Sequence, residues 1–283
     1  MKIIHVGCQL DYEVQLPTTF IFSIAAATTE HQRIRDETLE LTPQVNYEWF
    51  PSGEESNRSI RFAAQAGNFS LKYQATVQLT PELDQTPDLH EISHLSLPTY
   101  VLPYLNPSRY CESDRLARFA LRTFGDIEPG YTRVKAICDW VYNHTDYIIG
   151  STDVSSSAVD VLVQRAGVCR DFAHLSITLC RALGIPARYV AGYAPKLQPP
   201  DFHGFFEAFL GGKWYLFDAS RMAPVSGFVR IGAGRDAADA SFATLVGASF
   251  LQNMEVFAIN TQAAADGDSD APDHREQLAI STA

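Results

Sequence analysis

Three residues whose side chains could act as nucleophile, base and orienting acid follow one another along the chain. Cys169 lies in the segment Gly167–His174, and His203 and Asp218 come after it. A thiolate attacks carbonyl carbon, and a nearby imidazolium stabilises the thiolate and later protonates the leaving group. A carboxylate can hold the imidazole in the orientation that this chemistry needs. Each residue alone would more often be structural, but the order Cys…His…Asp predicts a catalytic constellation for acyl transfer.

Cys169 is expected in the first turn of a helix. Apolar residues recur at helical spacing from Phe172 to Leu183, and Gly184 followed by Pro186 marks the helix end. The N–H groups and the partial positive charge at a helix start favour an anion such as a thiolate and can hold an oxyanion. Gly167 is predicted to allow the tight turn into this helix.

His203 and Asp218 are expected to meet across a β-hairpin. The strands Phe205–Leu210 and Lys213–Asp218 flank the pair Gly211-Gly212, which is typical of a two-residue primed turn. Such a turn fixes the register, so that the first residue of one strand faces the last residue of the other. Side-chain alternation then puts His203 and Asp218 on one face as diagonal neighbours, about 7–8 Å apart at the backbone.

Four further cysteines are expected to be structural: Cys8, Cys111, Cys138 and Cys180. The five cysteines are odd in number and widely spaced, which argues against a disulfide framework or a thiolate zinc site. A reducing, cytoplasmic location is therefore expected.

Other polar residues are weighed against a role in the site. His174 follows the nucleophile by five residues on the same helix and cannot readily reach back, so a structural role is expected. His90 and His94 have the spacing of a metal pair, but no third ligand is in evidence. Glu207 shares the predicted face of His203, and it fits a place in the cleft and a solvated strand position equally well.

Composition and charge narrow the class of protein. The 283 residues are 46% hydrophobic and 19% charged, as in ordinary globular proteins. The net charge of −11 argues against a basic face for nucleic acid. No apolar run approaches the roughly 18 residues that span a bilayer, and the first residues turn polar too early for a secretory signal. We therefore expect no nucleic-acid partner and no membrane association; the oligomeric state is left open.

The chain divides into three predicted parts. Residues 1–98 are rich in β-branched and aromatic side chains with partial alternation, which predicts an antiparallel β-sandwich. Residues 99–262 carry helical stripes followed by strands, which predicts an α+β catalytic domain with helices packed on an antiparallel sheet. Residues 263–283 are acidic and poor in apolar residues, which predicts a disordered tail. Helices are expected over Ser113–Phe124, from Val134 to near Tyr147, and over Ala158–Gln164.

The sequence resembles the transglutaminase-like superfamily, which shares its catalytic core with papain-type cysteine proteases. Four blocks carry the resemblance: Gly167–Ala173, Arg181–Tyr193, His203–Asp218 and Gly234–Asp239. The β-rich start is similar to the N-terminal domain of bacterial members. No single block is specific, but their combination is.

The resemblance implies that Cys169 is the nucleophile, His203 the general base and acid, and Asp218 the residue that orients His203. It implies an enzyme that acts on amide bonds of a protein or peptide, with a cysteine peptidase or amidase favoured over a protein-glutamine transglutaminase. A non-catalytic binding or scaffold protein is the remaining alternative. Nothing resembles the calcium sites of animal transglutaminases, so no metal and no cofactor are predicted.

Some positions depart from the family pattern or stay open. Family members usually have Ala-Trp after the histidine, where this chain has Gly204-Phe205. No motif identifies the side-chain donor of the oxyanion hole; Gln164 is the candidate that is considered. Gly234–Asp239 could bind an anion at a helix start, but a capped turn at a helix start, with no ligand, is the favoured interpretation. The loops 151–157 and 195–202 are expected to form cleft walls.

Overall fold

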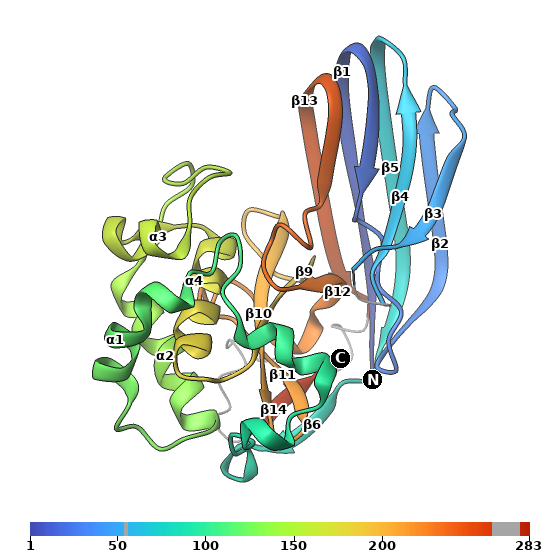
Figure 1. Ribbon diagram of the computed structural model, residues 1–283. Coiled ribbons are helices and arrows are strands. Elements are labelled where there is room, and N and C mark those ends of the chain that lie inside the picture. Colours follow the sequence, from blue (N-terminus) through green and yellow to red (C-terminus); the bar gives the residue numbers. More distant parts are fainter. Residues whose placement is uncertain (54–55, 262–277) are drawn as a thin grey trace.

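The computed structural model describes residues 1–53, 56–261 and 278–283. It has the predicted α+β fold, with a β-sandwich beside a part in which helices pack on an antiparallel sheet (Figure 1). Among the described residues, no helix is both long and apolar enough to cross a membrane.

The sandwich is built around one long strand. β1 (Lys2–Phe22) pairs with β5 (Gly67–Leu79) up to Val14 and with β4 (Arg58–Ala64) from Thr18 onward. Figure 1 shows β1 turning over between these two halves, which folds the sheet into two layers. The outer strands on the two layers are β2 (Gln32–Thr42) and β3 (Tyr47–Pro51). Alternate side chains point inward and form an aromatic core that includes Tyr12, Phe20, Phe22, Phe62 and Phe69.

The predicted catalytic domain, residues 99–262, extends too far toward the C-terminus. β13 (Ala243–Asn260) pairs with β1 from Ile4↔Asn260 to Phe22↔Ala243, so these residues belong to the sandwich and not to the catalytic domain. The second flank of β1 needs a partner for its backbone N–H and C=O groups, and β13 supplies it. Most β13 side chains are exposed, so alternation gives little signal there.

The last residues of the predicted disordered tail are ordered in a strand. β14 (Leu278–Ser281) pairs with β6 (Glu82–Gln85) and buries Ala279 and Ile280. The rest of the predicted tail lies outside the described residues.

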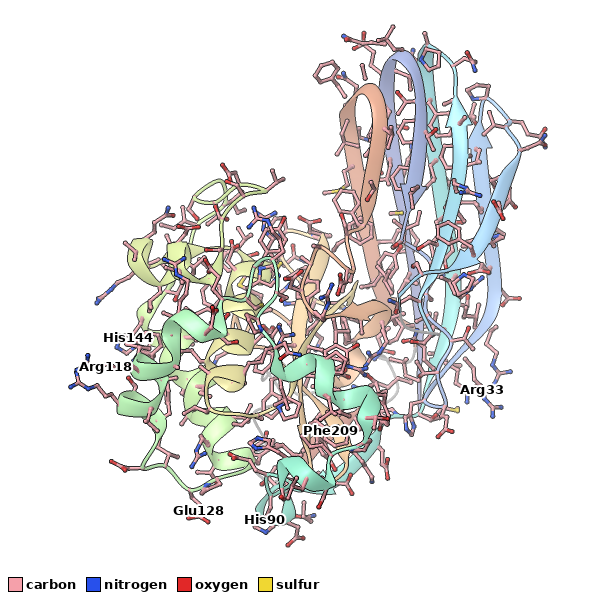
Figure 2. All side chains as sticks on the ribbon, viewed as in Figure 1. Arg33, His90, Arg118, Glu128, His144 and Phe209 are labelled. Carbon is pink, nitrogen blue, oxygen red and sulfur yellow. The ribbon has the colours of Figure 1, made fainter. Side chains whose placement is uncertain are left out.

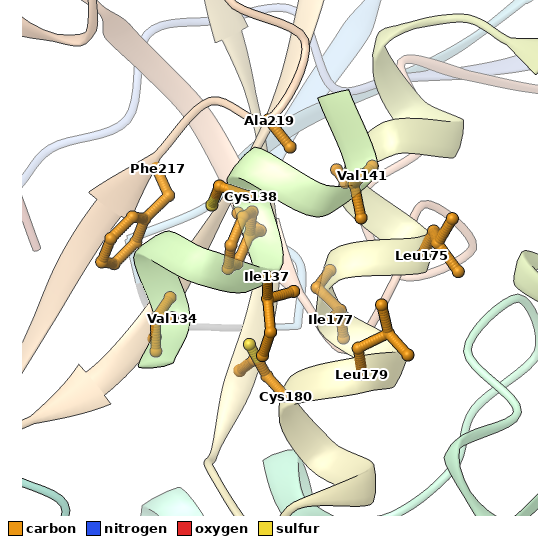
Figure 3. Packing of buried hydrophobic residues seen from close by; sticks show 14 of the residues in the cluster. Val134, Ile137, Cys138, Val141, Leu175, Ile177, Leu179, Cys180, Phe217 and Ala219 are labelled. Carbon is orange, nitrogen blue, oxygen red and sulfur yellow. The ribbon is translucent and has the colours of Figure 1, made fainter. Parts of the chain in front are cut away.

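Among the described residues, the remaining part contains four α-helices, a four-stranded sheet and two short pairs of strands. α4 (Cys169–Ala182) packs on the sheet, and the other helices pack against α4 (Figures 1 and 3). The helices are α1 (Ser113–Phe124), α2 (Tyr131–His144) and α3 (Ala158–Gln164), joined by the short strands β7 (Asp146–Tyr147) and β8 (Ala166–Gly167). The sheet order is β11 (Lys213–Phe217), β10 (Phe202–Leu210), β9 (Ala187–Tyr193) and β12 (Val229–Gly234). Short 3-10 helices lie at Thr86–Asp88, His94–Ser96, Thr99–Leu105 and Val225–Gly227.

The helices follow the predicted pattern with one difference. Apolar residues of α2 such as Ile137 and Cys138 meet α4 in the core (Figure 3), whereas Arg118 and His144 project outward (Figure 2). α2 ends at His144, earlier than predicted, and Tyr147 lies in β7. The parallel pairing of β7 with β8 takes the backbone groups that a longer helix would have used.

The predicted hairpin register is confirmed over five pairs, from Leu210↔Lys213 to Phe206↔Phe217. Gly211 and Gly212 have φ values of 56° and 95°, as a primed turn requires. Glu207 has neither of the two roles considered for it. Its fully buried carboxylate is paired with Arg188 of β9 and with Arg230 of β12, the strand beyond β9 in the sheet.

Candidate active site

The start of α4 is fixed by the side chain of Asp171, which sequence reasoning missed. Its buried carboxylate accepts the Val168 N–H at 2.8 Å and the Thr152 hydroxyl at 2.5 Å. An acidic side chain in the first helical turn is the usual capping signal, and the same carboxylate ties down the 151–157 loop. Cys169, one residue after Val168, is partly exposed.

Gly167 has a different role from the predicted one. It lies in β8, and its backbone is not in the left-handed region. A Cβ at this position would lie 2.7 Å from the Asp171 Cβ and 3.1 Å from its Oδ2. Gly167 therefore allows the close approach of Asp171, and not a special turn.

Gly167→Ala is expected to destabilise the fold by about 1–3 kcal/mol and to change the reactivity of Cys169, because Asp171 must move. Urea unfolding and the iodoacetamide rate at Cys169 measure both effects. Gly227→Ala is the matched control, since the nearest atom to its new Cβ would be Pro195 Cγ, 3.3 Å away. Equal effects of the two substitutions would contradict this role.

His203 and Asp218 meet, as the hairpin register predicts. His203 Nε2 lies 3.1 Å from Asp218 Oδ2, and both side chains are almost fully buried. Phe205 packs edge-on against the imidazole, with the ring centroids 4.5 Å apart. Ser220 donates its hydroxyl and N–H to Asp218 Oδ1 at 2.6 and 2.8 Å. Ser220 was not identified from the sequence; a serine two residues after an aspartate is a signal for such a turn.

His203 and Asp218 each favour the charged form of the other, although burial opposes both charges. Burial opposes charging of His203, but the Asp218 charge, their hydrogen bond and the interaction with Cys169 raise the pKa of His203 to about 10. Burial also opposes ionisation of Asp218, yet His203 and Ser220 hold the pKa of Asp218 below its usual value. An imidazolium–carboxylate pair is therefore the favoured form at neutral pH.

The structure also places Cys169 near the His203 imidazole. The Cys169 thiol interacts with His203, and Nε2 is taken by Asp218, which leaves Nδ1 for the sulfur. Nδ1 is buried and has no partner within full hydrogen-bond geometry. Loose contacts of this kind are common in unliganded active sites and tighten when substrate binds. The arrangement can supply a thiol nucleophile, a proton carrier and a group that orients it.

Other polar positions named from the sequence lie in structural contacts. His174 is buried between Tyr110 and Tyr189, accepts the Ala237 N–H at 3.1 Å, and burial lowers its pKa to about 3. His94 Nε2 lies 2.8 Å from the Gly184 carbonyl oxygen. His90 lies at the edge of the molecule (Figure 2).

The structure also places the Gly234–Asp239 block and Gln164, the other candidates named from the sequence. In the Gly234–Asp239 block, the buried Asp236 carboxylate accepts the N–H groups of Tyr110 and Ala238, and Arg235 pairs with Asp239. The block is thus a capped turn, as the sequence favoured, but it leads into β13 and does not start a helix. Gln164 is exposed at the end of α3. Within the described ranges, no group of three or more His, Cys, Asp or Glu side chains is placed to hold a metal ion.

Comparisons with known proteins agree with this architecture. Residues 117–219 match the transglutaminase-like superfamily model, and residues 1–100 match the model of the bacterial transglutaminase N-terminal domain. A crystal structure described as a "putative cysteine protease" from Cytophaga hutchinsonii is 44% identical, with a TM-score of 0.92 over 99% of this chain and 97% of that chain.

Two mycobacterial relatives cover less. The chain is 35% identical to the uncharacterized protein ML0607 of Mycobacterium leprae (strain TN) over 144 residues, 48% of this chain and 51% of that protein. It is 35% identical to Rv2569c of Mycobacterium tuberculosis (strain ATCC 25618 / H37Rv) over 105 residues, 37% of this chain and 33% of that protein. The chain thus spans about half or less of these two relatives. With its two matched domains and its near-complete likeness to the Cytophaga structure, the chain belongs to the transglutaminase-like superfamily.

Proposed function

We propose that this protein is a thiol-dependent acyl-transfer enzyme that acts on amide bonds of a protein or peptide, most simply as a cysteine peptidase or amidase. The observation that carries the proposal is the position of His203. One ring nitrogen lies 3.1 Å from the Asp218 carboxylate, and the ring also interacts with the Cys169 thiol. A nucleophile, a proton carrier and an orienting acid in contact are the minimum for this chemistry.

The proposed reaction has two steps. The Cys169 thiolate gives an electron pair to the amide carbonyl carbon, and the π pair of the carbonyl moves onto oxygen. When that pair returns, the C–N bond breaks and the leaving amine takes the proton from the His203 imidazolium. Water then attacks the thioester and gives a proton to His203, and the C–S bond breaks to release the acid and regenerate the thiolate.

Asp218 keeps its charge throughout this cycle. It holds the His203 ring so that Nδ1 faces the sulfur, and it stabilises the imidazolium. Ser220 in turn fixes Asp218 through two hydrogen bonds. An amine in place of water in the second step would give transamidation with the same residues.

Trapping of the acyl-enzyme tests the proposal. We expect p-nitrophenyl acetate to acetylate Cys169 far faster than it acetylates a cysteine in a short peptide, with the adduct located by peptide mass spectrometry. Release of the adduct with and without an added primary amine then separates hydrolysis from transfer. A library of peptides and glutamine amides defines the substrate class. Acetylation of Cys169 no faster than of the peptide thiol would favour the non-catalytic alternative.

A further inference from the structure

Tyr147 is held next to the nucleophile by the backbone. In the parallel pair of β7 and β8 it lies opposite Gly167, two residues before Cys169. The hydrogen bonds Asp146 N–H to Arg165 O (2.8 Å) and Ile148 N–H to Gly167 O (3.0 Å) fix the strand on both sides of the tyrosine. The position of Tyr147 relative to Cys169 is therefore set by main-chain geometry and not by a flexible loop.

The ring and the hydroxyl of Tyr147 have separate contacts. The ring packs against Phe172, one turn along α4, with the ring centroids 5.8 Å apart. The hydroxyl lies close enough to Cys169 to interact with both its backbone N–H and its thiol. A carbonyl bonded to Sγ would direct its oxygen toward this same N–H, because the first N–H groups of a helix point away from the helix with no partner inside it.

We propose that the Tyr147 hydroxyl is the side-chain donor of the oxyanion hole and acts together with the Cys169 N–H. The inference rests on the proposed function and adds a catalytic residue to it. In the free protein the hydroxyl lies beside the N–H and the thiol of Cys169. When the C–S bond forms and the π pair moves onto the carbonyl oxygen, that oxygen receives both hydrogen bonds. When the pair returns and the C–N bond breaks, both are released.

The environment keeps Tyr147 suited to donate without ionising. Burial and the charge of Cys169 raise the pKa of Tyr147 well above its ordinary value. The hydroxyl therefore keeps its proton and stabilises the oxyanion by a hydrogen bond, as preorganised donors in other acyl-transfer enzymes do.

Two other side chains are weaker candidates for this position. Tyr189 also lies near Cys169, but its hydroxyl is packed against Gly204, where a Cβ would lie 2.6 Å away, and its interaction with Cys169 is through charge alone. This contact also explains why glycine follows the histidine here. Gln164 is exposed and lies before the αL residue Arg165 that ends α3.

Two reactions of the same thiol test the proposal. Attack on p-nitrophenyl acetate passes through an oxyanion, whereas attack on the methylene carbon of iodoacetamide does not. Tyr147→Phe keeps the ring on Phe172 and removes only the hydroxyl. We expect acetylation of Cys169 to fall on the order of 10²-fold, and alkylation to change by less than about threefold. Tyr47→Phe, an exposed tyrosine in β3 of the sandwich, should change neither rate.

The remaining outcomes overturn the proposal. If both rates fall together, Tyr147 only positions Cys169. If both rise, its hydroxyl blocks the thiol. If neither changes, the hydroxyl has no role in the reaction. These results leave the proposed function intact when the wild-type protein is acetylated rapidly at Cys169. If the wild type is not, the proposed function fails and this inference fails with it.

Discussion

Cys169→Ala is expected to lower kcat/KM on amide and ester substrates by about 10⁴-fold or more, because no other group can form the thioester. Cys169 is partly exposed at the first position of α4 and is not part of the apolar core. The fold should therefore remain, with a midpoint of thermal unfolding close to that of the wild type. Steady-state assays and a thermal melt measure the two quantities on the same sample.

A second cysteine in the same helix provides the matched control. Cys180 is fully buried among residues of α2 and α4 (Figure 3), and burial raises the pKa of its thiol far above the ordinary value. Cys180→Ala should keep activity and lose about 1 kcal/mol of stability through the cavity that it leaves. Activity that survives in Cys169→Ala but not in Cys180→Ala would overturn the assignment of the nucleophile.

Asp218→Asn is expected to reduce kcat/KM by about 10³–10⁴-fold while the binding of substrate changes little, because the imidazole loses its orientation and its counter-charge. The titration of His203 should change with it. In the wild type, burial lowers the pKa of His203, but Asp218 together with Cys169 raises it to about 10; without the Asp218 charge the pKa is expected to fall. NMR of labelled histidine follows both titrations. An unshifted His203 in the variant would show that Asp218 is not its partner.

The pair of His203 and Asp218 should also make the difference in unfolding free energy between wild type and Asp218→Asn depend on pH. The pKa of His203 is raised in the folded state, so its contribution is fully present below 6.5 and is lost as the pH rises through about 10. The pKa of Asp218 is lowered, so its contribution is lost as the pH falls below 3.8. Wild type should therefore exceed Asp218→Asn by on the order of a few kcal/mol near pH 5–6, and by less near pH 10. Urea unfolding at the two pH values checks the sign.

Local signals made part of the site predictable. The Gly211-Gly212 turn fixed the register of β10 and β11, and the meeting of His203 with Asp218 follows from that register. The start of α4 was also predictable, because an apolar helical pattern begins beside Cys169. Both features depend on residues close together in the sequence.

Features that depend on distant residues were not predictable in the same way. The pairing of β13 with β1 joins residues more than two hundred positions apart, and the exposed side chains of β13 do not encode it. The ion pair between Glu207 and Arg230 is not predictable from the sequence, because only the order of strands in the sheet brings these two residues together. The sequence pattern predicts a helix that runs to near Tyr147, because the parallel pair that holds this residue has two residues in each strand, too few to show alternation.

The return of β13 to β1 means that the sandwich is discontinuous in sequence, with the α+β part inserted between its strands. The sandwich and the α+β part therefore cannot be separated by a single cut in the chain. A fragment that stops before residue 243 would leave one flank of β1 with open backbone donors and acceptors along nearly its whole length, and such edges promote association with other chains. The inserted α+β part is joined to the sandwich at both of its ends, after β5 and before β13. Exchange of this insert between relatives would have to keep both junctions, which makes loop grafting around Cys169 a more practical route to new specificity than domain shuffling.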